Sequence, residues 1–298
     1  MDETESSARP SRLLPILTLL LLTAITAVSA ARAQEEDSAD DGLPVGLLLA
    51  AMRAGEGSYS AHAWLEVPGD ALGQNAPSTL LFRLRALNSV GAEEGSFERS
   101  VILEGETAER ARDAGIKVHG EFPLAPGAYT LELTVTGDGS LLAERRFPFA
   151  LAPWESGRAA VLPPFFIDDL EAHAVVRPTT TDPVTDPFRT GAGETFVPVV
   201  VPVISKGETR ARVTLVGYHL TGEKNLLEAR LFTADGDLLG KDRLGLVAQS
   251  ETAPDGLDRL DFSLGTEGLA PGDYQLEVSI QDLAHGRTDE TLMPFRIE

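Results

Sequence analysis

The chain has 298 residues and a net charge of −21 at neutral pH, because its 46 acidic residues outnumber its 25 basic residues. Such a charge repels nucleic acid and anionic lipid, so neither is an expected partner. The chain has no cysteine, which excludes disulfide bonds, thiol catalysis and cysteine-ligated zinc or iron–sulfur centres.

The N-terminus has the pattern of an export signal. Two arginines precede an apolar run at residues 13–28, and Ala31-Arg32-Ala33 offers a cleavage site. The apolar run is shorter than the roughly 20 residues that span a bilayer. We therefore predict a cleaved signal peptide at residues 1–33, followed by an acidic flexible segment at 34–42. The protein is then exported, to the periplasm or the extracellular space, and is tethered to the membrane if the leader is not cleaved.

The pattern of apolar and polar residues predicts a first β-sandwich domain at residues 43–152. In Thr79–Leu87, alternate residues are apolar, and the side chains of residues 80, 82, 84 and 86 are the expected core face. Residues 106–114 are rich in helix formers and stop at Gly115, which predicts one short helix. Strands are predicted at residues 43–53, 59–67, 79–87, 97–103, 116–122, 128–136 and 141–151, with Asp138-Gly139 as a hairpin turn.

Residues 153–163 predict a linker, and residues 164–298 a second β-sandwich domain. The region 177–193 is dense in Pro, Thr, Asp and Gly, so we expect a long, mobile surface loop that proteases can cut. Strands are predicted at residues 165–176, 195–204, 210–220, 225–233, 238–249, 257–264, 273–283 and 288–297.

One phrase occurs twice. Leu-Ala-Pro-Gly-Ala-Tyr-Thr-Leu-Glu-Leu at residues 124–133 returns as Leu-Ala-Pro-Gly-Asp-Tyr-Gln-Leu-Glu-Val at 269–278. The copies are about 145 residues apart, which is the spacing of domains and not of solenoid repeats. Tyr129 and Tyr274 begin a strand after a Pro-Gly turn, as the tyrosine of a tyrosine corner does. The sequence therefore predicts an all-β chain of two tandem immunoglobulin-like β-sandwich domains.

Three segments together resemble the C-terminal region of large exported bacterial proteins related to von Willebrand factor A. They are residues 111–118, residues 186–198 and the last Pro-Gly-x-Tyr strand, and the likeness covers most of residues 43–298. Those proteins also carry an A domain with a metal-binding Asp-x-Ser-x-Ser motif, which this chain lacks. The resemblance therefore implies a stand-alone accessory module and transfers no metal ligand.

Other candidate residues favour structural roles. His62, His119, His173, His219 and His285 lie in separate predicted elements without metal-ligand spacing. Asp168 and Asp169 are adjacent, so in a strand they point to opposite faces and cannot form a catalytic pair. The acidic turns at residues 182–186 and 235–237 lack the ligand pattern of a calcium loop. Trp64 is expected in the core and Trp154 at the domain junction, the alternative being sugar stacking.

The sequence favours a non-enzymatic exported protein that makes protein–protein contacts in the envelope or outside the cell, with no catalytic, metal-binding or cofactor-binding residues. The alternative is a carbohydrate-binding accessory module, and a hydrolase with its site in the long loop is the third possibility. A contact module requires an apolar patch or an open strand edge, whereas a sugar binder requires exposed aromatic rings in a groove. An enzyme requires a polar cleft with shifted pKa values.

Overall fold

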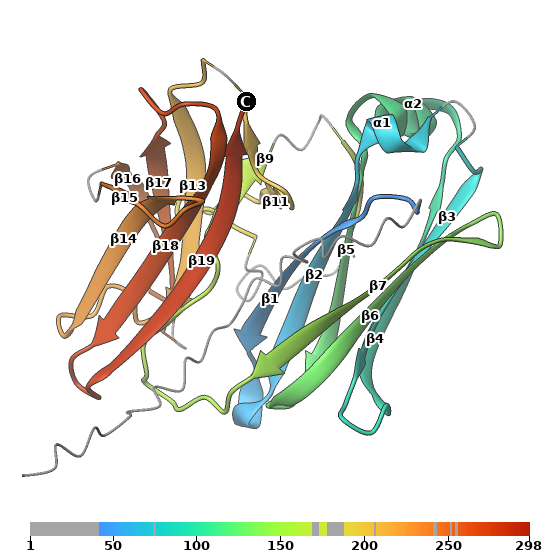
Figure 1. Ribbon diagram of the computed structural model, residues 1–298. Coiled ribbons are helices and arrows are strands. Elements are labelled where there is room, and N and C mark those ends of the chain that lie inside the picture. The colour runs from blue at the N-terminus through green and yellow to red at the C-terminus, as the bar shows by residue number, and fades with distance from the viewer. Residues whose placement is uncertain are drawn as a thin grey trace, which may run out of the picture.

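The computed structural model describes residues 42–73, 76–168, 173–177, 188–205, 207–240, 243–250, 252–253 and 256–298. The predicted signal peptide and almost all of the acidic segment lie outside these ranges. Throughout the described part the chain is an all-β protein (Figure 1), as the sequence predicts. None of the helices in these ranges has the length and apolar character to cross a membrane.

Two four-stranded sheets form the part of the chain that we call the first domain, and the two other sheets form the part that we call the second domain. Sheet 1 has the order β1 (Gly46–Arg53), β2 (Tyr59–Val67), β5 (Ile116–Leu124) and β10 (Ala174–Val176). Sheet 2 has the order β4 (Glu93–Ile102), β3 (Thr79–Leu87), β6 (Gly127–Gly137) and β7 (Ser140–Leu151). The two sheets pack face to face over one core. The predicted face of β3 lies in this core, since residues 80, 82, 84 and 86 are all fully buried.

The helices of the described residues are short and lie in the first domain (Figure 1). Helix α2 (Gly105–Ala114) is the predicted one, and it ends before Gly115, whose φ of 103° favours glycine. A further turn of helix, α1 (Gly69–Leu72), packs against α2, and η1 (Gly55–Gly57) is a single 3₁₀ turn. The prediction of one helix therefore missed α1, which is too short to carry a helical period.

The second domain also contains two sheets. Sheet 3 has the order β11 (Val197–Pro198), β9 (Phe165–Asp168), β13 (Arg210–Tyr218), β17 (Leu257–Gly265) and β16 (Leu244–Gln249), with β8 (Ala160–Val161) also paired to β13. Sheet 4 has the order β12 (Val203–Ile204), β19 (Arg287–Ile297), β18 (Gly272–Asp282), β14 (Asn225–Thr233) and β15 (Leu238–Gly240).

Sheet 1 is shared between two cores. Its strands β1, β2 and β5 lie between sheet 2 and the second domain (Figure 1), and six consecutive residues of β1 are buried. Leu47, Leu49 and Ala51 belong to the core of the first domain. Leu48 and Trp64 belong to the core that the second domain builds. The two domains therefore meet over a continuous apolar surface.

The structure corrects three of the predicted strands, because the chain changes sheets within them. Residues 165–176 supply β9 to sheet 3 and β10 to sheet 1, so β10 joins the first domain by pairing parallel with β5. Residues 195–204 give two strands of two residues each, β11 and β12. Residues 238–249 give β15 at the end of sheet 4 and β16 at the end of sheet 3. Alternation of apolar and polar residues indicates a half-buried strand, but it does not indicate which sheet the strand joins.

The predicted loop at 177–193 is only partly described, since residues 178–187 lie outside the described ranges. From residue 188 onward the prediction of a mobile surface loop is wrong. Phe188 is fully buried, and Arg189 pairs with Thr195 in a β-bridge. Gly191 donates its backbone N–H to Asp261 at 2.9 Å. A single aromatic ring anchors this stretch because the outer face of sheet 1 offers it aromatic neighbours.

Candidate functional site

The structure brings two of the five histidines together in the domain interface. Trp64 of β2 pairs across the strands with His119 of β5, with their rings stacked 4.9 Å apart. His62 stacks on His119 at 5.6 Å, and Phe188 of the second domain meets these rings edge-on. Trp64 is in the core as predicted. The meeting of the histidines could not be predicted, because it depends on strand pairing across 57 residues of chain between residues 62 and 119.

His119 is a neutral packing residue. It is fully buried, and burial lowers the pKa of its imidazole to about 2. Neither of its ring nitrogens has a hydrogen-bond partner in the described part of the chain. A buried imidazole without partners is held by its aromatic neighbours alone, so any proton that it gained would be strongly unfavourable.

A buried lysine fixes the same interface. The side chain of Lys117 in β5 is fully buried, and its Nζ donates to the carboxylate of Asp168 in β9 and to the carbonyl of Pro198, the latter at 3.2 Å. Its Nζ also lies 3.6 Å from the carboxylate of Glu66. Asp168 therefore serves to join the domains, while its predicted neighbour Asp169 lies outside the described residues.

Among the remaining histidine candidates, His173 joins the cluster around Lys117, since its Nδ1 lies 3.6 Å from the carboxylate of Asp168. His285 contacts Asp282 at 2.8 Å, and the turn containing Asp235 and Asp237 is exposed. Residues 182 and 186 lie outside the described ranges. No group of three or more histidines or acidic residues with the geometry of a metal site occurs among the described residues.

Both repeated tyrosines make the predicted corner contact. Tyr129 donates its hydroxyl to the carbonyl of Ala125 at 2.7 Å, and Tyr274 donates to Ala270 at 2.5 Å. Each acceptor lies four residues upstream, just before the Pro-Gly turn. Equivalent residues of the two repeats therefore make equivalent hydrogen bonds.

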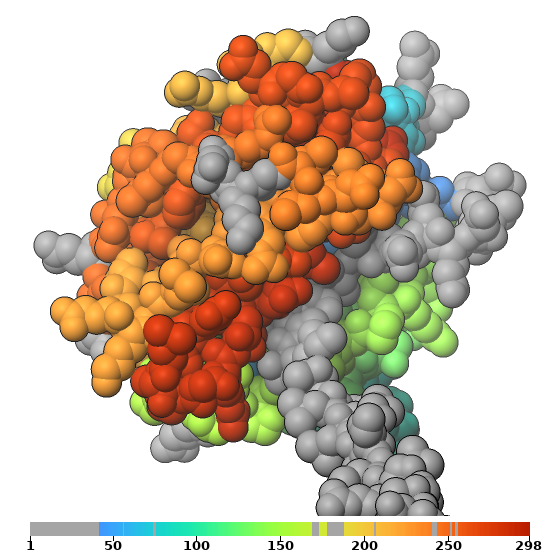
Figure 2. Space-filling model, turned by 60° about the vertical axis from the view of Figure 1, so that its left-hand side comes forward, coloured from blue at the N-terminus to red at the C-terminus, as the bar shows by residue number. Residues whose placement is uncertain are grey.

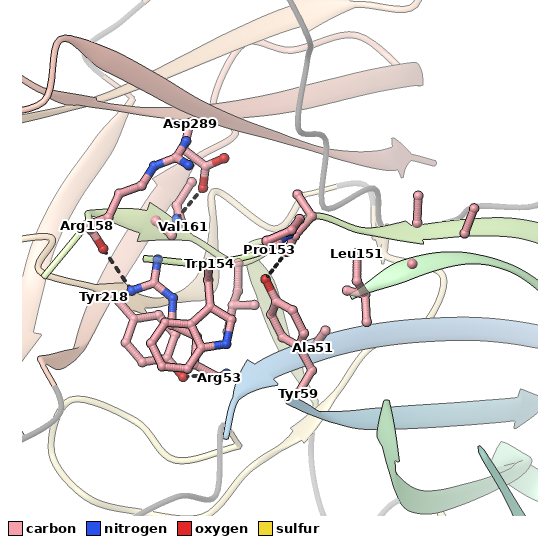
Figure 3. Close-up of a pocket in the computed structure, with 16 residues that line it drawn as sticks. Ala51, Arg53, Tyr59, Leu151, Pro153, Trp154, Arg158, Val161, Tyr218 and Asp289 are labelled. Atoms are coloured by element: carbon pink, nitrogen blue, oxygen red, sulfur yellow. Dashed lines mark hydrogen bonds between the residues drawn. The ribbon is translucent and has the colours of Figure 1, made fainter. Parts of the chain in front are cut away.

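A cavity of about 300 Å³ lies at the junction of the two domains, beside the linker (Figure 3). Its polar side chains come from the end of β1, the start of β2, the linker, the end of β13 and the start of β19. They are Arg53, Tyr59, Trp154, Arg158, Tyr218 and Asp289. The rest of its wall is apolar, with Ala51, Leu151 and Leu162 among its members.

Arg53 is the central group of this junction cavity. Its guanidinium lies 4.3 Å from the centre of the Tyr218 ring and 5.4 Å from the centre of the Trp154 ring (Figure 3). Both distances are within cation–π range. The guanidinium donates to the carbonyl of Arg158 at 2.8 Å, and the backbone N–H of Arg53 donates to the Tyr218 hydroxyl at 2.8 Å. Burial lowers the pKa of the guanidinium, because the charged form loses hydration.

The linker is held from both domains. Tyr59 donates its hydroxyl to Ala152 at 2.7 Å, and the indole of Trp154 donates to Ser58 at 3.0 Å. From the other side, Asp289 accepts the backbone N–H of Val161 at 2.9 Å. Burial raises the pKa of the Asp289 carboxyl. Trp154 therefore packs at the domain junction, as predicted.

A second candidate surface is the apolar edge, which we define as Leu238 and Leu239 of β15 together with Leu246 and Val247 of β16. The exposed fractions of these four side chains run from 38% for Leu239 to 69% for Val247. β15 is the last strand of sheet 4 and β16 the last strand of sheet 3. This side of the second domain comes forward in Figure 2, in orange. The signal in the sequence was the uncharged run Leu-Gly-Leu-Val-Ala-Gln at 244–249.

The long edge strands of the first domain differ from this surface in charge. β4 carries the acidic residues Glu93, Glu94 and Glu98, all exposed, and β7 carries Glu144 and Arg146, also exposed. Charges at a sheet edge prevent pairing with other chains. β15 and β16 carry no charged residue within their bounds. The second domain therefore exposes a strand edge without charged side chains, where β15 has three residues and the pairing of β16 shifts register between Leu246 and Ala248.

No protein-family model matches the chain, and no curated protein matches it in sequence.

Proposed function

We propose that this protein is a non-enzymatic, exported contact module that binds other proteins in the cell envelope or outside the cell. The observation that carries the proposal is the apolar edge. Monomeric proteins seldom leave neighbouring apolar side chains exposed on a strand edge that carries no charge, because such edges can pair with other chains. Here four exposed aliphatic side chains gather on the terminal strands of two sheets.

The proposed partner is an extended segment of another protein that adds a strand to β15 or β16. Strand addition uses the open backbone N–H and C=O groups for affinity and the exposed side chains for selectivity. The segment would carry apolar residues to cover Leu246 and Val247. It would be neutral or basic, because the chain carries a net charge of −21 and repels acidic partners.

We further propose that both domains are immunoglobulin-like sandwiches. The hairpins β6–β7 and β18–β19 support this, since each carries a tyrosine whose hydroxyl bonds back across a corner, as in sandwiches of that type. Such domains commonly serve as contact modules in exported proteins. The resemblance to the C-terminal region of proteins related to von Willebrand factor A is consistent with an accessory role of this kind.

Two observations weigh against the alternatives. All 18 aromatic residues, 12 Phe, 4 Tyr and 2 Trp, lie in the described part of the chain, and none of them is exposed. A carbohydrate-binding module stacks sugars on exposed rings, so this surface does not suit that function. The junction cavity has a single carboxylate, Asp289, and neither serine nor histidine in its wall. It therefore lacks an acid–base pair or a nucleophile for hydrolysis.

The proposal can be tested by photocrosslinking in cells that produce the protein naturally. A benzoylphenylalanine at position 247 samples the apolar edge, and one at position 141 samples an exposed leucine on the charged edge strand β7 as the matched control. Leu141 is 60% exposed, close to the 69% of Val247. We expect a protein adduct at position 247 that is absent at position 141.

The substitution Leu246→Lys should then abolish the adduct, because a lysine on an edge strand blocks strand addition. Leu141→Lys should leave it unchanged. Both variants should melt like the parent protein, since both side chains are exposed. Equal adduct yields at positions 247 and 141 would contradict the proposal.

A further inference from the structure

The junction cavity holds hydrogen-bond acceptors and hydrogen-bond donors, and three of its acceptors each accept a hydrogen bond from the protein. The carbonyl of Ala152 accepts from Tyr59, and the carbonyl of Arg158 accepts from Arg53. The carboxylate of Asp289 accepts from the backbone of Val161. A ligand that only donated hydrogen bonds would therefore share these acceptors with N–H and O–H groups of the protein.

The N–H groups of the two arginines in the cavity, in contrast, are mostly without an acceptor within the described ranges. A guanidinium has five N–H groups. That of Arg53 uses NH1 for the carbonyl of Arg158, and no other hydrogen bond or ion pair engages its side chain in the described part of the chain. The guanidinium of Arg158 makes no hydrogen bond and no close ion pair among the described residues, but its charge favours the ionised form of Asp289 in the same cavity. The cavity therefore presents two cations whose N–H groups still require acceptors.

The net charge and the size of the cavity further restrict the class of ligand that can bind. The two arginines outnumber the one carboxylate, so the cavity has a net positive charge within a chain whose net charge is −21. Its remaining wall is built from small and apolar side chains such as Ala51, Leu151 and Leu162. At about 300 Å³, it is at the small end of ligand sites.

We propose that the junction cavity binds a carboxylate attached to a small apolar group. The carboxylate would accept from Arg158 and from the free N–H groups of Arg53, since a guanidinium matches the two oxygens of a carboxylate. The apolar group would lie against Leu151 and Leu162. Two sources supply this chemistry: the C-terminal residue of a polypeptide, and a free organic acid. The site is separate from the apolar edge, so it does not depend on the proposed function.

Isothermal titration calorimetry on the full chain tests the proposal with two carboxylates and their amides. The probes are N-acetyl-alanyl-leucine and hexanoate, with N-acetyl-alanyl-leucinamide and hexanamide as uncharged counterparts. At least one carboxylate should bind saturably with a Kd below about 1 mM, and its amide should bind at least tenfold more weakly. Tighter binding of the dipeptide identifies a polypeptide C-terminus as the source, and tighter binding of hexanoate identifies an organic acid.

Two variants should shift the affinity in opposite directions. Arg158→Gln removes one of the two cations and leaves the contacts of Arg53 with the Tyr218 and Trp154 rings in place, and it should weaken binding about tenfold or more. Asp289→Asn removes the competing negative charge, keeps an oxygen for the N–H of Val161, and should tighten binding severalfold. Arg112→Gln, on the exposed face of α2, is the control and should change nothing.

Three results would overturn the proposal. They are the absence of saturable binding by both carboxylates, equal binding of acid and amide, and an unchanged affinity in Arg158→Gln. Thermal melting of each variant separates a lost site from a lost fold.

Discussion

Replacing Phe188 by alanine should loosen the whole domain interface. The ring is fully buried and has five aromatic neighbours, at centroid distances of 5.2 Å to His119, 5.4 Å to Phe165, 5.5 Å to Trp64, and 6.0 Å to both His62 and Phe196. Three of these neighbours belong to the first domain. Truncation of a buried phenylalanine costs about 3–5 kcal/mol. Each favourable aromatic pair adds about 0.5–1.5 kcal/mol beyond area burial, so we expect a loss near the upper end of the 3–5 range.

The measurement is urea denaturation followed with two probes. Fluorescence reports mainly on the interface, because Trp64 lies within it and Trp154 lies at the junction. Circular dichroism reports on the strands of both domains. In the parent protein the two transitions should coincide, since sheet 1 belongs to both cores. In Phe188→Ala the fluorescence transition should move to a lower urea concentration than the transition seen by circular dichroism.

The matched control is Phe232→Ala. Phe232 is only half-buried and lies on β14, so its loss should cost about 1 kcal/mol and keep the two transitions together. A loss below about 1 kcal/mol in Phe188→Ala would refute the reasoning. So would a fluorescence transition that is already separate in the parent protein, because the domains would then unfold independently.

Three further substitutions test the two tyrosine corners and the buried imidazole. Tyr274→Phe should lower the free energy of unfolding by about 1 kcal/mol, because the carbonyl of Ala270 loses its hydrogen-bond donor. Tyr129→Phe should have the same effect in the first domain. An unchanged melting temperature in either variant would contradict the corner role. His119→Phe should make stability less dependent on pH. The folded pKa of His119 is about 2 and the unfolded value about 6.5, so the unfolded chain binds the extra proton below pH 6.5 and stability falls as the pH falls. Between pH 7.5 and pH 5 this group should remove about 2 kcal/mol at 1.36 kcal/mol for each pKa unit, a loss that urea titrations should find in the parent protein and not in the variant.

Local features of the fold were predictable from the sequence because they depend on neighbours in the chain. Strict alternation located Thr79–Leu87 and its core face, and the Pro-Gly-x-Tyr phrase predicted both corner hydrogen bonds. The turn at Asp138-Gly139 was also predictable, since both residues have the positive φ that such a hairpin requires, 47° and 85°. Each of these features depends only on residues that are close together in the sequence.

Some information on burial was also present in the sequence. The unbroken apolar run of β1 is typical of a strand that is covered on both faces. It indicates a second covering layer, without indicating that the layer is the other domain. Similarly, the run Leu244–Gln249 shows that β16 carries no charged side chain, but only the strand order places this strand at the end of a sheet.

The candidate sites were decided by the tertiary structure. Arg53 meets Tyr218 across 165 positions of the chain, and His62 meets His119 only because β2 pairs with β5. The point at which residues 238–249 leave one sheet for the other is set by how two layers close over a core. The alternation of apolar and polar residues along a strand indicates whether one or both of its faces are buried. It does not indicate which distant strand lies beside it. The pairing of distant strands creates the junction cavity and the apolar edge.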